Sequence, residues 1–135
     1  MTLSHTGDRL RTAVHSPQAP AAIGPYSQAI RHDHTLFCSG ALPVDPATGE
    51  LVSDHPADQT TQCLHNLAEV CRAADTTLRR ALRLTVYTTR LDRFAEINDA
   101  YAAFFADDPP ARVTIGVAQL PKNATVEIDA IVALT

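Results

Sequence analysis

The fold is decided by residues 108–134, which read Asp-Pro-Pro-Ala-Arg-Val-Thr-Ile-Gly-Val-Ala-Gln-Leu-Pro-Lys-Asn-Ala-Thr-Val-Glu-Ile-Asp-Ala-Ile-Val-Ala-Leu. Two runs rich in β-branched residues flank a turn-like segment, Leu120–Asn123, so the stretch predicts two strands joined by a short connection. The second run alternates, with Glu127 and Asp129 facing one side and apolar residues facing the other. These apolar residues are Val126, Ile128, Ala130 and Val132.

Two charged residues of this stretch are candidates for chemistry. Arg112 stands where a Pro-Pro loop enters the first strand, and the planar guanidinium of an arginine can bind a carboxylate ligand through two hydrogen bonds. Glu127 lies inside the second strand, and a carboxylate on a nearby strand can carry a proton or orient a water molecule. A structural Arg–Glu ion pair fits the same spacing and is the commoner use of such residues. From the spacing alone, both interpretations stay open.

The length of 135 residues is typical of one domain, and the apolar content of 45% is enough for a core. No window contains the run of about 20 apolar residues that crosses a bilayer. The first residues lack the apolar region of a signal peptide. We therefore expect a flexible tail over residues 1–10 and a single domain over residues 11–135, located in the cytoplasm and not in a membrane.

Charge and metal-ligand patterns disfavour two classes of function. With 11 Lys plus Arg against 15 Asp plus Glu, the net charge is −4, so nucleic-acid binding is not expected. The three cysteines form no Cys-x-x-Cys pair and are expected to be free thiols, with Cys63 and Cys71 buried on one face of a helix. His32 and His34 bracket a turn, and we expect no metal site.

The remaining elements follow from periodicity and turn residues. We predict strands over residues 10–14, 29–31, 35–42 and 82–89, a helix from Pro56 to about Ala74 capped by Asp54, and a second helix capped by Asp92. The resulting order, β-β-β-α-β-α-β-β, favours an α+β fold with both helices on one face of the sheet. Two helices cannot cover both faces, so an oligomer is expected to cover the other.

Three further positions have both a structural and a functional interpretation. Tyr26 lies in a loop fixed by Gly-Pro, where a tyrosine is more often packed than catalytic. Ser39 and Gly40 lie inside a strand, where a glycine indicates either a plain β-bulge or a ligand that needs room. Asn98 stands at the edge of the apolar stripe of the second helix, which we interpret as core. That stripe contains Phe94, Ile97, Tyr101, Phe104 and Phe105.

Several motifs, in this order, resemble one known family. They are Ile23-Gly-Pro-Tyr-Ser-Gln28, Ser39-Gly-Ala-Leu-Pro43, Asp45-Pro-Ala-Thr-Gly-Glu-Leu51, Thr85-Val-Tyr-Thr-Thr89, Pro110-Ala-Arg112 and Val126-Glu-Ile-Asp-Ala-Ile131. Together they resemble the Rid family of reactive-intermediate deaminases, also called the YjgF family, over roughly residues 11–134. The resemblance implies a chorismate-mutase-like α+β protomer with a mixed sheet, assembled as a homotrimer with a central barrel and clefts between subunits.

The same resemblance implies an activity and a set of site residues. Deaminases of this family hydrolyse 2-imino and enamine acids, such as 2-aminoacrylate and 2-iminopropanoate, to 2-keto acids and ammonia without a cofactor. Arg112 corresponds to the arginine that binds the substrate carboxylate, and Glu127 to the glutamate thought to position or activate water. By the same correspondence, Tyr26 is the loop tyrosine, and Ser39, Gly40 and Asn98 are substrate-binding residues.

The chain also departs from the family's best-characterised deaminases. A serine and often a cysteine follow the arginine in many of them, whereas Val113 and Thr114 stand here. Gly116 and Gln119 replace a glutamate and an arginine, and Ala41 replaces a common glutamine. The resemblance is therefore to another branch of the family, and Thr114 could offer a hydroxyl to the substrate.

Three functions follow as hypotheses. The first is the imine deaminase that uses Arg112. The second is a non-catalytic or regulatory protein that binds 2-keto acids in the same cleft. The third is the endoribonuclease activity described for some relatives, which the acidic charge and the lack of a His–His or His–Lys pair disfavour.

Overall fold

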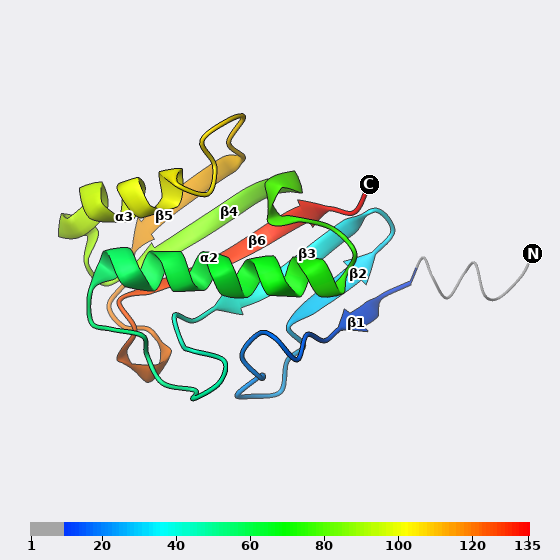
Figure 1. Ribbon diagram of the computed structural model, residues 1–135, viewed down its shortest axis with the longest axis horizontal. Coiled ribbons are helices and arrows are strands. Elements are labelled where there is room, and N and C mark those ends of the chain that lie inside the picture. Colours follow the sequence, from blue (N-terminus) through cyan, green and yellow to red (C-terminus); the bar gives the residue numbers. More distant parts are fainter. Residues whose placement is uncertain (1–9) are drawn as a thin grey trace, which may run out of the picture.

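The computed structural model describes residues 10–135, so the predicted tail lies outside the described residues except for its last position. Six strands form one mixed sheet in the order β1-β2-β3-β6-β4-β5 (Figure 1). Neighbouring strands are antiparallel, except that β4 and β5 are parallel. The strands are β1 Thr12–Val14, β2 Ala29–His32, β3 Thr35–Ala41, β4 Ala81–Thr88, β5 Ala111–Gly116 and β6 Val126–Ala133.

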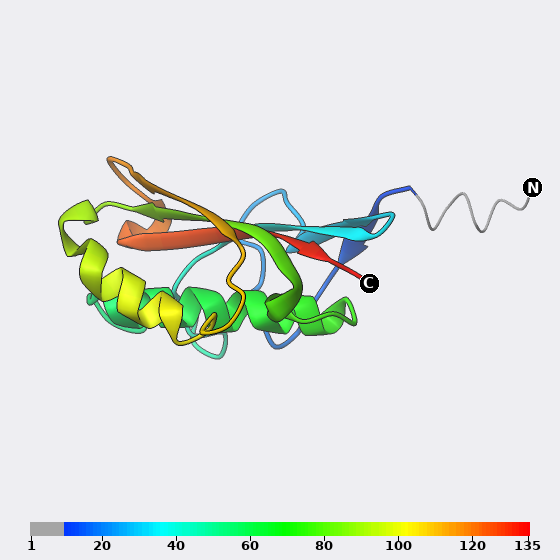
Figure 2. The same ribbon diagram turned by 90° about the horizontal axis from the view of Figure 1, so that it is seen from above.

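Helices α2 (Pro56–Ala73) and α3 (Phe94–Ala102) lie on one side of this sheet (Figure 2). The order of strands and helices is the predicted one, and the predicted placement of both helices on one face is confirmed. Short 3-10 helices occur at η1 (Leu78–Arg80), η2 (Leu91–Arg93) and η3 (Pro121–Asn123). Within residues 10–135, no helix is both long and apolar enough to cross a membrane.

Strand β6 is the central strand of the core. Its residues alternate between buried and half-buried, as predicted, and Val126, Ile128 and Val132 are fully buried against the helices. The alternation turns Glu127 and Asp129 toward the other face of the sheet. Because the apolar residues of β6 are buried against the helices, the carboxylates of Glu127 and Asp129 must lie on the opposite face of the sheet.

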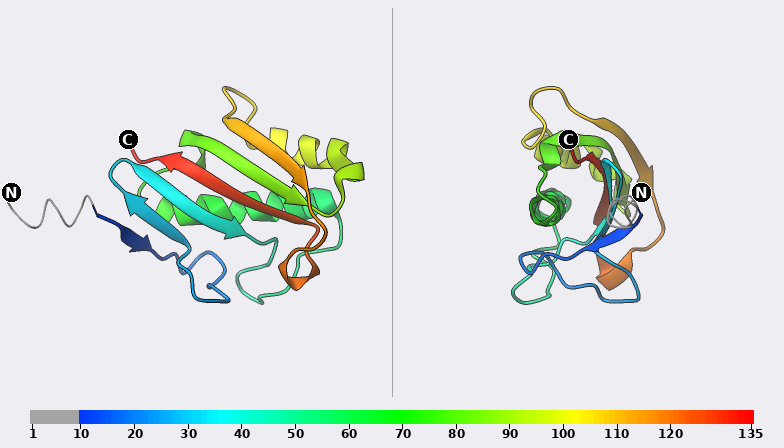
Figure 3. Two further views of the ribbon diagram at one scale, coloured as in Figure 1. Left: turned by 180° about the vertical axis from the view of Figure 1, so that it is seen from behind. Right: turned by 90° about the vertical axis from the view of Figure 1, so that its right-hand side faces the viewer.

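The face opposite the helices is bare in the described chain (Figure 3). Phe37, Val113 and Ile115 project from it and are 46%, 45% and 47% exposed. Each alternates along its strand with residues that turn toward the helices, so these side chains belong to the bare face. An apolar face of this kind on a sheet is usually covered by another surface.

The two C-terminal strands do not pair with each other. Strand β4 lies between them, pairing in parallel with β5 and antiparallel with β6. A parallel pair needs a crossover, which η2 and α3 provide. The turn-like segment predicted at Leu120–Asn123 is present as η3, in which Lys122 and Asn123 adopt left-handed backbone angles.

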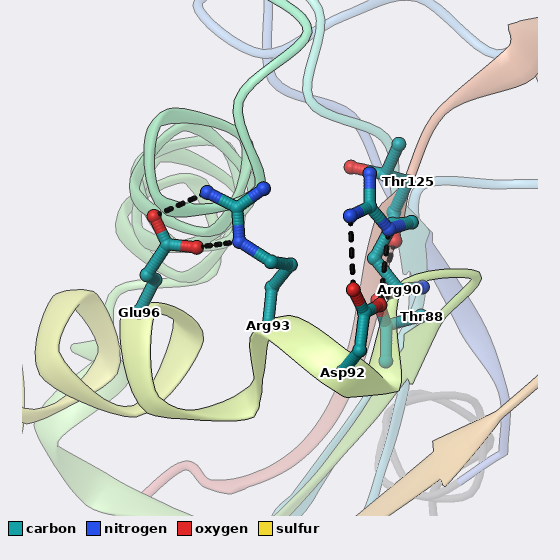
Figure 4. A network of polar contacts seen from close by, with 6 residues as sticks. All are labelled: Thr88, Arg90, Asp92, Arg93, Glu96 and Thr125. Carbon is teal, nitrogen blue, oxygen red and sulfur yellow. Dashed lines mark hydrogen bonds and ion pairs between the residues drawn. The ribbon is translucent and has the colours of Figure 1, made fainter.

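The predicted helix caps at Asp54 and Asp92 are wrong. Helix α2 begins after His55, whose N–H donates to the Ser53 hydroxyl oxygen at 3.0 Å, while that hydroxyl donates to Asp58. Asp92 lies within η2, two residues before the start of α3, and its carboxylate accepts two hydrogen bonds from Arg90 (Figure 4). Neither helix has a side-chain hydrogen bond at its N-cap, and at Asp92 the neighbouring Arg90 engages the carboxylate that was expected to form the cap.

A polar network positions the start of α3 relative to the sheet (Figure 4). The Thr88 hydroxyl donates to the carbonyl oxygen of Thr125 at 2.7 Å and accepts the N–H of Arg90 at 2.9 Å. Arg93 and Glu96 form an ion pair in the first turn of α3. The network joins the ends of β4 and β6 to the helix that faces β5.

Gln59 is a fully buried polar residue that joins α2 to β6. Its side-chain oxygen accepts the N–H groups of Thr125 and Val126 and the Thr125 hydroxyl, at 2.7, 3.1 and 2.9 Å. Its amide nitrogen donates to the Ser53 carbonyl at 2.8 Å. The Gln59 side chain therefore forms hydrogen bonds both with the segment just before α2 and with the start of β6.

We predict that Gln59→Ala lowers the free energy of unfolding by about 3 kcal/mol, because it leaves several buried groups without partners and opens a cavity. Gln62→Ala is the matched control, since Gln62 is half-buried and its side chain forms a single hydrogen bond, to Asn66, within residues 10–135. It should cost less than about 1 kcal/mol. Urea denaturation of both variants measures the difference, and equal losses would contradict the assigned role of Gln59.

The cysteine prediction is confirmed for the helix. Cys63 and Cys71 are fully buried on the sheet-facing side of α2, and Cys38 on β3 is 8% exposed. All three are free thiols. Burial raises the pKa of Cys63, so its thiol stays protonated and acts as a small apolar group.

Candidate functional site

Arg112 lies on the edge strand β5 and faces the helix layer. It is opposite Leu84 in the register of β4, and Leu84 is buried against the helices. Its Nη1 donates to Oδ1 of Asn98 on α3 at 2.7 Å. Its guanidinium carbon lies 5.5 Å from the ring centre of Phe94 and 4.8 Å from that of Tyr101. One helix therefore holds the cation by an amide and two aromatic rings.

This arrangement leaves the guanidinium available for a ligand. Within residues 10–135, Arg112 forms the one hydrogen bond to Asn98 and no ion pair. The side chain is half-buried, so its remaining N–H groups can reach a small molecule from solvent. A guanidinium that is already oriented loses less entropy when it binds a carboxylate.

Two buried hydroxyls beside Arg112 have no hydrogen-bond partner in the described chain. They are Oη of Tyr101 and Oγ1 of Thr114, which lies two residues along β5 on the same face as Arg112. An unpaired buried hydroxyl costs about 1–3 kcal/mol, so such groups usually meet a water or a ligand. Burial raises the pKa of Tyr101 although the nearby Arg112 cation opposes this, so the hydroxyl remains a proton donor.

A second group of predicted residues surrounds Glu127 on the bare face of the sheet. A hollow of about 310 Å³ is lined by Glu127 together with Tyr26, Ser39 and Gly40. These residues come from β6, from the loop before β2 and from the end of β3. The structure therefore brings four of the predicted site residues together around one cavity.

The Ser39–Gly40 position is a β-bulge. The register of β3 against β6 shifts between Cys38 and Ala41, and the side chain of Glu127 fills the space beside Gly40. A Cβ atom on Gly40 would lie 2.9 Å from Cδ of Glu127 and closer still to its Oε2. A side chain at position 40 would therefore displace the end of the Glu127 side chain on the neighbouring strand.

Hydrogen bonds fix the two loop-side residues of this hollow. The Ser39 hydroxyl donates to the carbonyl of Ser27 at 2.6 Å, which leaves its oxygen free to accept. The Tyr26 hydroxyl accepts the N–H of Ile23 at 3.2 Å, and Tyr26 is 45% exposed. Tyr26 is therefore a rim residue and not a packed core side chain.

Glu127 is in an environment that favours its neutral form. Burial raises the pKa of Glu127, and the negative charge of Asp129 on the same face raises it further. Asp129 accepts a hydrogen bond from the Tyr87 hydroxyl at 2.8 Å, and this bond raises the pKa of Tyr87. A carboxyl whose pKa is raised toward neutrality is suited to exchanging protons.

Arg112 and Glu127 do not form the ion pair that their spacing left open. Arg112 is opposite Leu84 and Glu127 is opposite Tyr87, and these two β4 residues are three apart, so their side chains point to opposite faces. Within one chain the sheet separates the arginine group from the glutamate group. A structural ion pair between Arg112 and Glu127 of the same chain is therefore excluded.

The contact of Phe94 and Tyr101 with Arg112 was missed by the sequence analysis. Ile97, Tyr101 and Phe105 are buried, as expected for core residues, but Phe94 is 39% exposed. The rings of Phe94 and Tyr101 both contact the guanidinium of Arg112. The spacing of Phe94, Asn98 and Tyr101 places them on one helical face, which is the pattern that could have indicated a shared partner.

Comparison with known proteins identifies similar chains. The model of the endoribonuclease L-PSP family matches residues 16–134. The chain is 50% identical over 117 residues to the RutC family protein y4sK of Sinorhizobium fredii, covering 87% of this chain and 93% of that protein. It is 41% identical to the 2-iminobutanoate/2-iminopropanoate deaminase of Bos taurus, covering 90% and 89%. The crystal structure of E. coli TdcF with bound serine superposes with a TM-score of 0.87 at 35% identity, covering 92% and 99%.

We predict that Gly40→Ala destabilises the protein by about 1–2 kcal/mol, because the added methyl group meets the Glu127 side chain. Removing that side chain as well, in Gly40→Ala/Glu127→Ala, should recover most of the loss. The control is Gly116→Ala, whose Cβ would come no closer than 3.5 Å to the nearest atom other than its chain neighbours. Denaturant unfolding of the four variants, including Glu127→Ala alone, gives the coupling, and additive effects would contradict the contact.

Proposed function

The chain belongs to the endoribonuclease L-PSP family, also known as the Rid or YjgF family, and on that premise we propose that it hydrolyses reactive 2-imino and enamine acids to 2-keto acids and ammonia. Mammalian relatives about 40% identical to this chain are named as deaminases of this kind. Substrates such as 2-aminoacrylate and its imine tautomer would react without a cofactor, as the family resemblance implies.

The observation that carries the proposal is the fixed guanidinium of Arg112. Asn98 and two rings orient it, and the unpaired hydroxyls of Tyr101 and Thr114 lie beside it. A small 2-imino acid presents a carboxylate to the guanidinium and further polar atoms to the hydroxyls. In this scheme Asn98 positions Arg112 and lines the same niche, so it contributes to substrate binding through the arginine.

The reaction itself is a hydration followed by loss of ammonia. Water adds its oxygen to the C=N carbon while the imine nitrogen gains a proton, giving a carbinolamine. That intermediate loses a proton from its hydroxyl and releases ammonia, leaving the 2-keto acid. Glu127 would orient the water, accept its proton and return it to the departing nitrogen, and Tyr26, Ser39 and Gly40 shape the space around it. Because hydrolysis of imines is intrinsically easy, positioning and charge neutralisation supply the acceleration.

We propose that the two groups meet between chains, with Arg112 of one copy facing the Glu127 hollow of another. This arrangement is needed because the sheet separates the two residues within one chain. The bare face with Phe37, Val113 and Ile115 supplies an apolar surface on which such copies can pack. A homotrimer with the sheets as a central barrel, which the family resemblance implies, would cover this face and complete the sites.

A non-catalytic binder of 2-keto acids is the second candidate. The arginine niche binds a carboxylate equally well in substrate and product, and the TdcF structure holds an amino acid. The two candidates differ in whether the purified chain accelerates the release of ammonia.

We predict that Arg112→Lys lowers kcat/KM for 2-aminoacrylate at least about 100-fold, because lysine keeps the charge and loses the two-point contact with the carboxylate. The assay measures ammonia release from 2-aminoacrylate generated by a serine dehydratase. The matched control is Arg72→Lys on α2, whose side chain is 79% exposed and should retain full activity. Size-exclusion chromatography establishes that each variant keeps its oligomeric state. Wild-type protein that binds 2-keto acids and gives no acceleration would support the binder instead.

The pH dependence tests the role of Glu127. As a base it must be ionised, so kcat/KM should fall as the pH drops through a pKa that burial and Asp129 hold above the ordinary glutamate value. Asp129→Asn removes the like charge, lowers the pKa of Glu127 and should move the acidic limb of the profile to lower pH. Glu127→Gln should abolish that limb together with most of the activity. An acidic limb that is unchanged in Asp129→Asn would contradict this assignment.

A further inference from the structure

A second hollow, of about 340 Å³, adjoins the one that contains Glu127. It lies between α2 and the loops before β2 and after β3, and we call it the apolar hollow. The two hollows share five lining residues, Ile23, Tyr26, Ser39, Gly40 and Leu42.

Gly40 lies in the wall of both spaces. The Glu127 carboxylate rests in the position that a Gly40 side chain would occupy, and Gly40 also lines the apolar hollow. A molecule that reacts beside Glu127 therefore has the apolar hollow within reach of its other substituents. Ile23 and Tyr26, 60% and 45% exposed, form a common rim over both spaces.

The walls of the apolar hollow offer mainly non-polar contact. Leu67 and Val70 line it from α2, and small alanines line it from the loops. Two amide side chains in the wall already have partners within the chain, whereas the Lys122 ammonium, which forms no ion pair within residues 10–135, also lines the hollow. The amide nitrogen of Asn66 donates to the carbonyls of Leu42 and Val44 at 2.9 and 3.0 Å.

Gln28 is satisfied in the same way. Its amide nitrogen donates to the carbonyl of Pro20 at 2.8 Å and its oxygen accepts the N–H of Ser16 at 2.6 Å. With these groups occupied, an apolar substituent can enter without leaving them unpaired. A polar substituent would lose water there and would gain new hydrogen bonds only at the few polar groups left, Lys122 and the Ser39 oxygen.

We infer that the apolar hollow receives the side chain of the substrate, so that the preferred substrates are 2-imino acids with a branched aliphatic or aromatic side chain. The inference rests on the proposed deaminase function and narrows it to one substrate class. Sites for ligands of drug-like size begin at about 300 Å³. The Glu127 hollow alone is therefore ample for the smallest imino acids, and the additional space of the apolar hollow serves a larger group.

The test compares imines made in situ by an amino-acid oxidase from alanine, leucine and phenylalanine, with the full chain as catalyst. Burial of each additional methylene is worth about 0.8 kcal/mol, or about fourfold in kcat/KM. The wild-type kcat/KM for the leucine-derived and phenylalanine-derived imines should therefore exceed that for the alanine-derived imine by at least about tenfold.

Two substitutions fill the apolar hollow from exposed loops, and each tests the inference separately. Ala47→Phe and Ala21→Phe introduce a ring at its wall, and both alanines are exposed, so folding should be retained. Each should lower kcat/KM for the large imines at least about fivefold and leave the alanine-derived imine within about twofold. Ala73→Phe, at the exposed end of α2 and outside the hollow, is the control for adding a ring to the surface.

The outcomes distinguish failure of the proposed substrate class from failure of the proposed deaminase activity. A wild-type preference for the alanine-derived imine, or large-imine rates unchanged in both filling variants, would overturn the substrate class and leave the deaminase intact. No acceleration with any of the three imines would overturn the deaminase and the inference with it. Loss of the large-imine preference in both filling variants, with the control unchanged, supports the inference.

Discussion

The alternation of side chains across the sheet is the constraint on which the site depends. Val126, Ile128 and Val132 must face the helices to form the core, so Glu127 has to face the other way. The same rule, applied through the register of β4, turns Arg112 toward α3. The chain thus offers a cation on one side of the sheet and a carboxyl on the other. Under the proposed deaminase function, a reaction that uses both side chains requires two copies of the chain.

Each half of the site is held by a different kind of interaction. Around Arg112 the helix supplies an amide and two aromatic rings, which orient the cation and leave most of its donors unused. Around Glu127 the constraint is steric, since the side chain lies against a glycine in a bulged strand. Burial and a neighbouring carboxylate then favour the protonated form of the glutamate. A charged arginine held in place suits carboxylate binding, and a glutamate whose pKa is raised by burial and by Asp129 suits proton transfer.

Local patterns predicted the elements well and the long-range geometry poorly. The alternation in residues 126–133 and the helical spacing in residues 56–73 depend on neighbours in the chain, and both predictions are confirmed. The position of β4 between β5 and β6 depends on pairing between distant segments, which no local pattern reveals. Asp54 and Asp92 have the composition of helix caps, but the His55 N–H donates to the Ser53 hydroxyl oxygen instead, and the Asp92 carboxylate accepts hydrogen bonds from Arg90. Tyr101 had the periodicity of a core residue, and only the packing of α3 against β5 shows that its ring also contacts a cation.

The contact between Gly40 and Glu127 also constrains how the sequence can diverge. Any other residue at position 40 would place an atom where the Glu127 carboxylate lies and would turn that side chain away, so a lineage that keeps the glutamate in this position is expected to keep the glycine. If the glutamate is lost, that restriction is removed, and residues with larger side chains can replace Gly40. The two positions should therefore be inherited as a unit for as long as the chemistry at the bulge is selected.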